Sequence, residues 1–159
     1  MSDNSDFAKQ LLEMYQGEVV GEVLFNIMLR QYPDAEHQFK SATMLQLETE
    51  TKARLRPALI ALGADLTEED ASRNVGQEFA ASIAGKDWLS AMAILTEGIT
   101  PYVDRYREIA ENAPSQYKEI ALSMVEHEAS LQAFVSAEAG GDGDEALRRI
   151  EQQLSYPLR

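Results

Sequence analysis

Apolar residues recur along this chain at intervals of three and four, the spacing that places side chains on one face of an α-helix. No segment shows a convincing alternation of apolar and polar residues, so no strand is predicted. Six helical segments follow from this pattern, and they cover residues 6–32, 35–62, 68–83, 87–111, 115–139 and 144–154.

Four of these segments are long and are joined by short connections. This arrangement predicts an all-α fold, an antiparallel four-helix bundle with a short additional helix between the second and third long helices and a short C-terminal helix. At 159 residues, the chain is expected to form a single helical domain over residues 1–159. Pro57 and Pro101 lie inside two of the long helices, and we expect them to kink or interrupt those helices.

The last two long helices carry clear stripes of the expected core. For the segment 87–111 the stripe is Leu89, Ala93, Thr96, Thr100 and Val103, with further apolar residues beside it. For the segment 115–139 it is Ile120, Met124, His127, Leu131 and Phe134. His127 therefore stands where a core residue is expected.

The composition limits the functions available to the chain. Its net charge of −13 and pI near 4.5 predict repulsion from nucleic acid and from anionic membranes. The absence of cysteine excludes disulfides, thiolate metal sites and a cysteine nucleophile, and it fits a reducing compartment. No apolar run is long enough to span a membrane, and the polar start at residues 1–6 lacks the positive region of a secretory signal. We expect a cytoplasmic protein with neither a nucleic-acid nor a membrane partner.

A histidine on a core face must be hydrogen-bonded, paired with a carboxylate or bound to a metal ion. Candidate partners are Glu18 or Glu22 on the first helix, and the spacing does not decide which of the two faces the core. Glu48 lies on the stripe of the second helix, and Glu97 borders that of the third.

Other polar residues near these stripes have simpler interpretations. Lys52 lies one turn after Glu48, so the two could form a structural ion pair without any metal. Glu128 borders the stripe of His127, and His37 is expected to be exposed.

The glutamates and the late histidine resemble the ferritin-like family of carboxylate-bridged di-metal proteins. Gly21-Glu22 is similar to the Gly-Glu opening of rubrerythrin-like metal helices, and Gly17-Glu18 repeats that dipeptide one turn earlier. Glu48 lies where the Glu-x-x-His motif of the second helix would fall. The resemblance covers the first, second and fourth long helices and implies metal candidates Glu18, Glu22, Glu48, Glu97 and His127.

The chain also departs from the family pattern, in which each of two helices supplies Glu-x-x-His. The second helix has Thr51 in place of the histidine, and the fourth has Met124 in place of the glutamate. The remaining groups could hold one ion of iron, manganese or zinc but not a standard di-metal centre.

Three functions are compatible with these patterns. The first is a ferritin-like protein whose metal centre is altered or lost and which acts as a binding or interaction module. The second is a metal-dependent oxidoreductase of this class, using iron or manganese in a non-standard centre. The third is a helical adaptor unrelated to the family. A cofactor-free protein fits as well as a metalloprotein, and the family analogy implies a homodimer.

Overall fold

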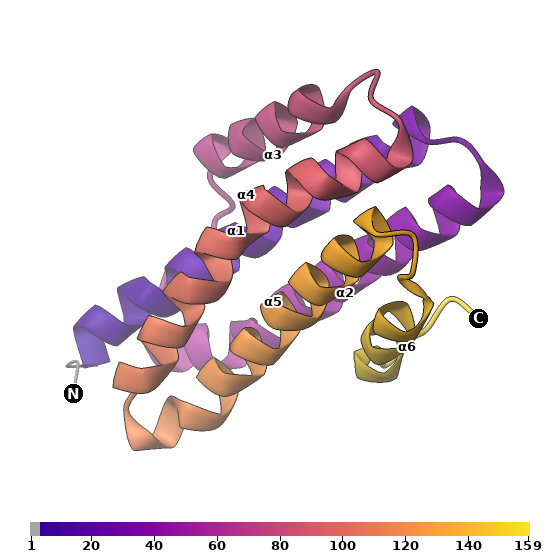
Figure 1. The fold of residues 1–159 in the computed structure, drawn as a ribbon. Helices are drawn as coiled ribbons and strands as arrows, with labels where there is room; N and C mark the ends of the chain where they lie inside the picture. Colours follow the sequence, from indigo (N-terminus) through magenta and orange to yellow (C-terminus); the bar gives the residue numbers. More distant parts are fainter. Residues whose placement is uncertain (1–3) are drawn as a thin grey trace.

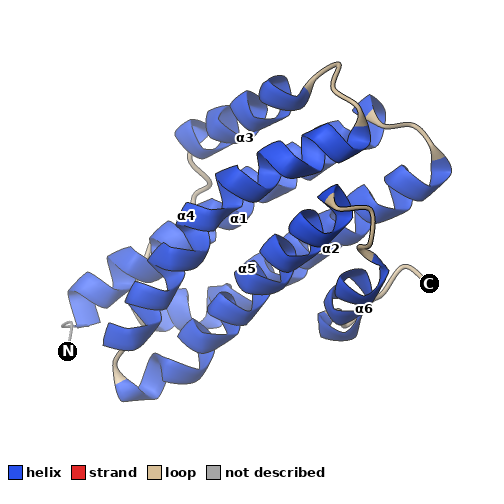
Figure 2. Ribbon diagram, in the orientation of Figure 1, coloured by secondary structure: helices blue, strands red, loops and turns tan. Residues whose placement is uncertain are grey.

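The computed structural model describes residues 4–159 and is helical over most of that range, with no strand among these residues (Figure 2). The all-α prediction is thus confirmed. The elements are α1 (Asn4–Gln31), α2 (Ala35–Ala61), α3 (Asp70–Ile83), α4 (Trp88–Asn112), a 3₁₀ turn (Ser115–Tyr117), α5 (Lys118–Ala139) and α6 (Asp144–Gln153). Residues 1–3, the start of the segment used to argue against a secretory signal, lie outside the described range.

The four long helices pack in two pairs. α1 lies along α2, and α4 lies along α5, each pair running in opposite directions (Figure 1). α3 packs mainly on α1 and also touches α4, whereas α6 packs on α5 and α2. The two short helices therefore cover different faces of the long ones.

The helix ends follow from local chemistry. The Asp34 side chain accepts hydrogen bonds from the backbone amides of Glu36 and His37 and caps α2, and Asp87 caps α4 in the same way through the amide of Ser90. Gly63, just after α2, adopts φ +72°, a left-handed conformation that favours glycine.

Neither proline divides its helix, so the interruption that the sequence suggested was wrong. α2 continues through Pro57 and α4 through Pro101. Both prolines are on the solvent-exposed side of their helices. There, water can bond the carbonyl that loses its amide partner, so the helix tolerates the ring.

On α4, the buried face of the helix differs from the predicted core stripe. Leu89 is 48% exposed and Ala93 is exposed, whereas the neighbouring residues Trp88, Met92 and Leu95 are buried. The larger side chains define the face that packs, because they bury more apolar surface per residue. On α5 the predicted stripe is buried from Met124 to Phe134, and Ile120 is half-buried.

The buried apolar residues form two clusters. The Phe7 cluster occupies one end of the long helices and includes Phe7, Leu11, Met14, Leu55, Leu59, Tyr106, Ile109 and Met124. The Phe25 cluster occupies the other end and includes Phe25, Met28, Met44, Leu47, Leu95, Ile99, Leu131 and Phe134. On α1, α2 and α5, the residues between the two clusters are polar and buried: Glu18, Glu48, Thr51, His127 and Glu128.

No helix among residues 4–159 combines the length and the apolar character needed to cross a membrane.

α3 approaches α1 closely at Gly76. A Cβ atom there would lie 2.6 Å from the carbonyl oxygen of Val20 and 2.8 Å from Cβ of Val23. We predict that Gly76→Ala lowers the free energy of unfolding by about 1–3 kcal/mol, although alanine favours a helix, because backbone atoms cannot yield. Urea unfolding measures this change.

Gly140→Ala is the matched control, since Gly140 has φ −81° and a Cβ there meets no atom closer than 3.4 Å. Its effect should stay within about 0.5 kcal/mol. Equal stabilities for the two variants would contradict the close packing of α3 on α1.

Candidate metal centre in a buried histidine–glutamate layer

His127 lies at the centre of the polar layer and is fully buried, as its helical stripe predicts. Its Nε2 atom is 3.0 Å from Oε2 of Glu18, 3.4 Å from Oε2 of Glu128 and 3.6 Å from Oε2 of Glu48. Three helices thus direct carboxylates at a single ring nitrogen.

The other ring nitrogen faces Thr51, whose Oγ1 lies 3.4 Å from Nδ1 of His127. Thr51 follows Glu48 by three residues on α2. A hydroxyl here can accept a hydrogen bond from Nδ1–H and so favour the tautomer that leaves the Nε2 lone pair free.

Glu48 reaches the layer because α1 has a glycine opposite it. A Cβ on Gly21 would lie 2.6 Å from Oε2 and 2.8 Å from Oε1 of Glu48. The Gly-Glu dipeptide on α1 therefore contributes through its glycine, which makes room for a carboxylate from α2.

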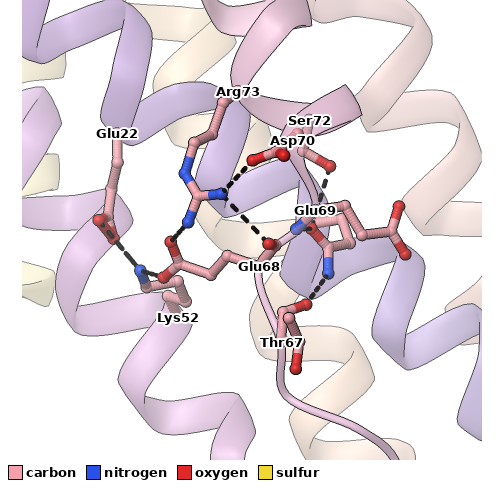
Figure 3. Close-up of polar contacts among 9 residues, drawn as sticks. Glu22, Lys52, Thr67, Glu68, Glu69, Asp70, Ser72 and Arg73 are labelled. Carbon is pink, nitrogen blue, oxygen red and sulfur yellow. Dashed lines mark hydrogen bonds and ion pairs between the residues drawn. The ribbon is translucent and has the colours of Figure 1, made fainter.

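The structure places Glu18, rather than Glu22, in the layer. Glu22 instead forms an ion pair with Lys52, with 2.8 Å between Oε1 and Nζ. Lys52 also contacts Glu68, which in turn binds Arg73 (Figure 3). This network fastens the connection between α2 and α3 to α1.

Three further expectations were wrong. Lys52 does not pair with Glu48, because the carboxylates of Glu22 and Glu68 are closer to it and lie nearer the solvent. Glu97 is exposed on α4 and does not approach the layer. His37 is half-buried, with its ring stacked on Trp88 at a centroid distance of 4.3 Å.

Glu128 was not among the predicted metal candidates, yet it belongs to the layer and is only 6% exposed. Its spacing from Met124 and Leu131, four and three residues, already placed it at the border of the buried stripe. This position beside the stripe was the one indication in the sequence that Glu128 is buried. It did not decide the question, because residues beside the apolar face of a helix are usually solvated.

α4 supplies tyrosines and no carboxylate to this level. Tyr106 is buried and its hydroxyl donates to the carbonyl of Met14, 3.3 Å away. Burial raises the pKa of Tyr106 well above its usual range, and the charges of Glu18 and Glu128 add to the effect. Tyr106 therefore stays neutral and serves as a hydrogen-bond donor beside the negative layer.

The surroundings of the layer raise the pKa of three of its side chains. Burial raises the pKa of Glu48 well above its ordinary value, and the neighbouring charge of Glu18 raises it further. Burial also raises the pKa of Glu128. For His127, burial alone would lower the pKa, but the charges of Glu18 and Glu48 outweigh it and raise the pKa well above 6.5.

The layer fits a metal ion by its geometry. Ligand atoms 2.0–2.2 Å from a common ion lie roughly 2.8–3.6 Å apart when they occupy neighbouring positions in octahedral or tetrahedral coordination. The nitrogen–oxygen separations of 3.0, 3.4 and 3.6 Å correspond to this range. Ligand atoms of Glu18, His127 and Glu128 all lie within 4.8 Å of one another.

Three buried atoms of the layer also lack a well-formed hydrogen bond. Nε2 of His127 and both carboxylate oxygens of Glu18 find no partner of hydrogen-bond geometry in the described structure, despite their proximity. Leaving such atoms unpaired costs about 1–3 kcal/mol each. A cation between them would satisfy all of these atoms together.

A small cavity of about 30 Å³ adjoins the layer, and Glu48 and Glu128 provide its charged wall. The remaining wall comes from α1, α3, α4 and α5 and includes Gly21, Phe79 and Tyr102. A molecule of the size of water can therefore approach the carboxylates from this side.

Comparisons with known proteins identify no relative: no family model, no curated protein and no solved structure matches this chain. The chemistry of the layer must therefore be inferred from its own residues.

The raised pKa values predict how the metal-free protein responds to pH. Above the ordinary pKa of 4.5, the native state keeps protons on Glu48 and Glu128 that the unfolded chain has lost, and above 6.5 the same holds for His127. This contribution to stability is complete below those values and is lost as the pH rises through the folded pKa values. The free energy of unfolding should therefore fall between about pH 5 and 8, measured by urea unfolding.

Glu48→Gln cannot ionise and should make the decline shallower, whereas the exposed control Glu97→Gln should retain it. If Glu48→Gln shows the wild-type slope, the native state does not hold a proton on Glu48.

Proposed function

We propose that this protein is a ferritin-like antiparallel four-helix-bundle protein with an altered centre that binds one divalent metal ion. Glu18, Glu128 and His127 Nε2 are the principal ligands, and Glu48 is a fourth. The single observation that supports this most strongly is the convergence of three buried carboxylates on one ring nitrogen.

Charge balance supports a cation in this place. Three carboxylates and a neutral imidazole carry up to three negative charges in a layer that is closed by hydrophobic clusters on both sides. Isolated buried carboxylates are costly, so the layer must hold protons, a metal ion or both. A divalent ion that displaces the protons of Glu48 and His127 neutralises most of this charge.

The ligand set favours a hard or borderline ion. Carboxylate oxygens with one imidazole suit manganese, iron or zinc, and the lack of thiolate argues against a site selective for soft ions. A single imidazole can bind a single ion. Glu22 could have been a ligand for a second ion, but its carboxylate is paired with Lys52. A single ion is therefore the better interpretation.

The second candidate function is a metal-dependent oxidoreductase that uses iron or manganese in this centre. The cavity beside Glu48 and Glu128 favours it, since a small molecule there would lie next to the ion. Consumption of oxygen by the anaerobically Fe(II)-loaded protein, absent from His127→Ala, would support this candidate. Oxygen uptake no faster than that of free Fe(II) would contradict it.

A homodimer, a cytoplasmic location and the absence of a nucleic-acid partner stay predictions from composition and family resemblance. Light scattering at several protein concentrations tests the dimer directly.

A finding that the protein binds no metal would favour the interaction-module function, in which the layer is purely structural.

The metal prediction is tested by equilibrium dialysis of the purified protein against Mn(II) and Co(II). We expect one ion per chain, a higher melting temperature on binding and release of protons to the buffer. Glu18→Gln should weaken binding at least about tenfold, because it removes a charged ligand with little change in shape.

Glu22→Gln is the matched control, one turn further along the same helix and engaged by Lys52. It should bind metal like the wild type. Wild-type protein that holds no metal above the buffer background, or equal losses in the two variants, would contradict the proposed site.

A further inference from the structure

An ion could reach the buried layer either along the axis of the long helices or from the side. Along the long helices, the Phe7 cluster closes one end and the Phe25 cluster closes the other. A hydrated cation cannot cross several turns of apolar side chains at an acceptable cost. Access must therefore come from the side.

The side covered by α3 has two hollows in series. The inner one is the cavity of about 30 Å³ that touches Glu48 and Glu128. The outer one is a groove of about 250 Å³ between α1, α3 and α4. Its outer lining includes Glu13, Gln16, Ala71, Ser72 and Val75. Both hollows are lined by Gly17, Val20 and Tyr102.

Of these three residues, Tyr102 has the largest side chain, and its ring is the group that can separate the groove from the cavity. A Cβ on Gly17 would lie 3.9 Å from Cδ1 of Tyr102, so the aromatic ring lies near the bare backbone of α1. The ring of Tyr102 is tilted against Phe79, with 6.5 Å between centroids, and is half-buried. Rotation of this one side chain would join the two hollows.

The rest of the groove is held in place. Gln16 of α1 accepts hydrogen bonds from the amide of Glu69 and from the hydroxyl of Ser72, each at 3.0 Å, and donates to the carbonyl of Thr67. These bonds fix the start of α3 against α1. The groove is therefore a preformed feature, and side-chain motion at Tyr102 is the local change needed to open it.

We propose that the groove between α1, α3 and α4 is the access route by which a hydrated divalent cation reaches the buried layer, and that Tyr102 sets the rate of its passage. This proposal rests on the proposed function, since it presumes that the layer binds a metal ion. It assigns Tyr102 a role in the kinetics of loading and none in the equilibrium affinity.

The test measures the rate of Co(II) loading by stopped-flow absorption, together with the equilibrium affinity for Co(II). Ala71→Trp places a bulky ring in the groove at an exposed position of α3 and should slow loading by about tenfold with unchanged affinity. Gln77→Trp is the control, because Gln77 is exposed on the same helix but does not line the groove.

Tyr102→Ala should accelerate loading by a similar factor, and Tyr102→Phe should load at the wild-type rate, because the ring and not the hydroxyl forms the partition. If Tyr102→Ala fails to fold, Ala71→Trp decides the matter alone.

The outcomes separate the two proposals. Wild-type protein that binds Co(II), with equal loading rates for Ala71→Trp and Gln77→Trp, overturns the access route and leaves the metal site intact. Wild-type protein that binds no Co(II) overturns the proposed function and the route with it.

Discussion

The fold depends on one imidazole held among three buried carboxylates. The interaction is strong because the layer lies between two hydrophobic clusters that keep water away from it. Two unit charges 4 Å apart interact by about 4 kcal/mol even at an effective dielectric constant of about 20. Three ionised carboxylates around one neutral ring would therefore repel one another by several times the stabilising effect of a typical hydrogen bond. Protonation and metal binding are the two means of relieving this repulsion, and both act on the same atoms.

The surrounding helices are shaped to bring these groups together. The lack of a side chain at Gly21 of α1 leaves room for the carboxylate of Glu48. The lack of one at Gly17 lets the hydroxyl of Tyr106 approach the helix. A glycine inside a helix costs about 1 kcal/mol of helix stability relative to alanine. The two glycines lie one turn apart on the helix that carries Glu18. α1 is thus less stable as an isolated helix than its length suggests, and it relies on packing against α2 and α3.

Much of this arrangement was predictable from the sequence, because a buried helical face has a fixed period. His127 was identified in that way, and Glu48 followed from the same rule on α2. The choice between Glu18 and Glu22 was not predictable, since it depends on Lys52 and Glu68, residues that only the tertiary structure brings near α1. Glu128 was missed and Glu97 wrongly included for a related reason. Both residues lie beside the apolar stripe of their helix. A small rotation of a helix about its axis decides which of the positions beside its stripe are buried.

Two residues beside the layer limit the number of ligands that it offers. Met124 lies one turn before His127 on α5 and is buried in the Phe7 cluster, so apolar packing reaches the edge of the layer. Thr51 contributes a hydroxyl, which lies 3.4 Å from Nδ1 of His127 and can orient the ring. Neither residue offers a carboxylate or a second imidazole. Three carboxylates buried around one imidazole are costly unless protons or a cation balance their charge, and this cost is the physical reason to expect such an occupant in the layer.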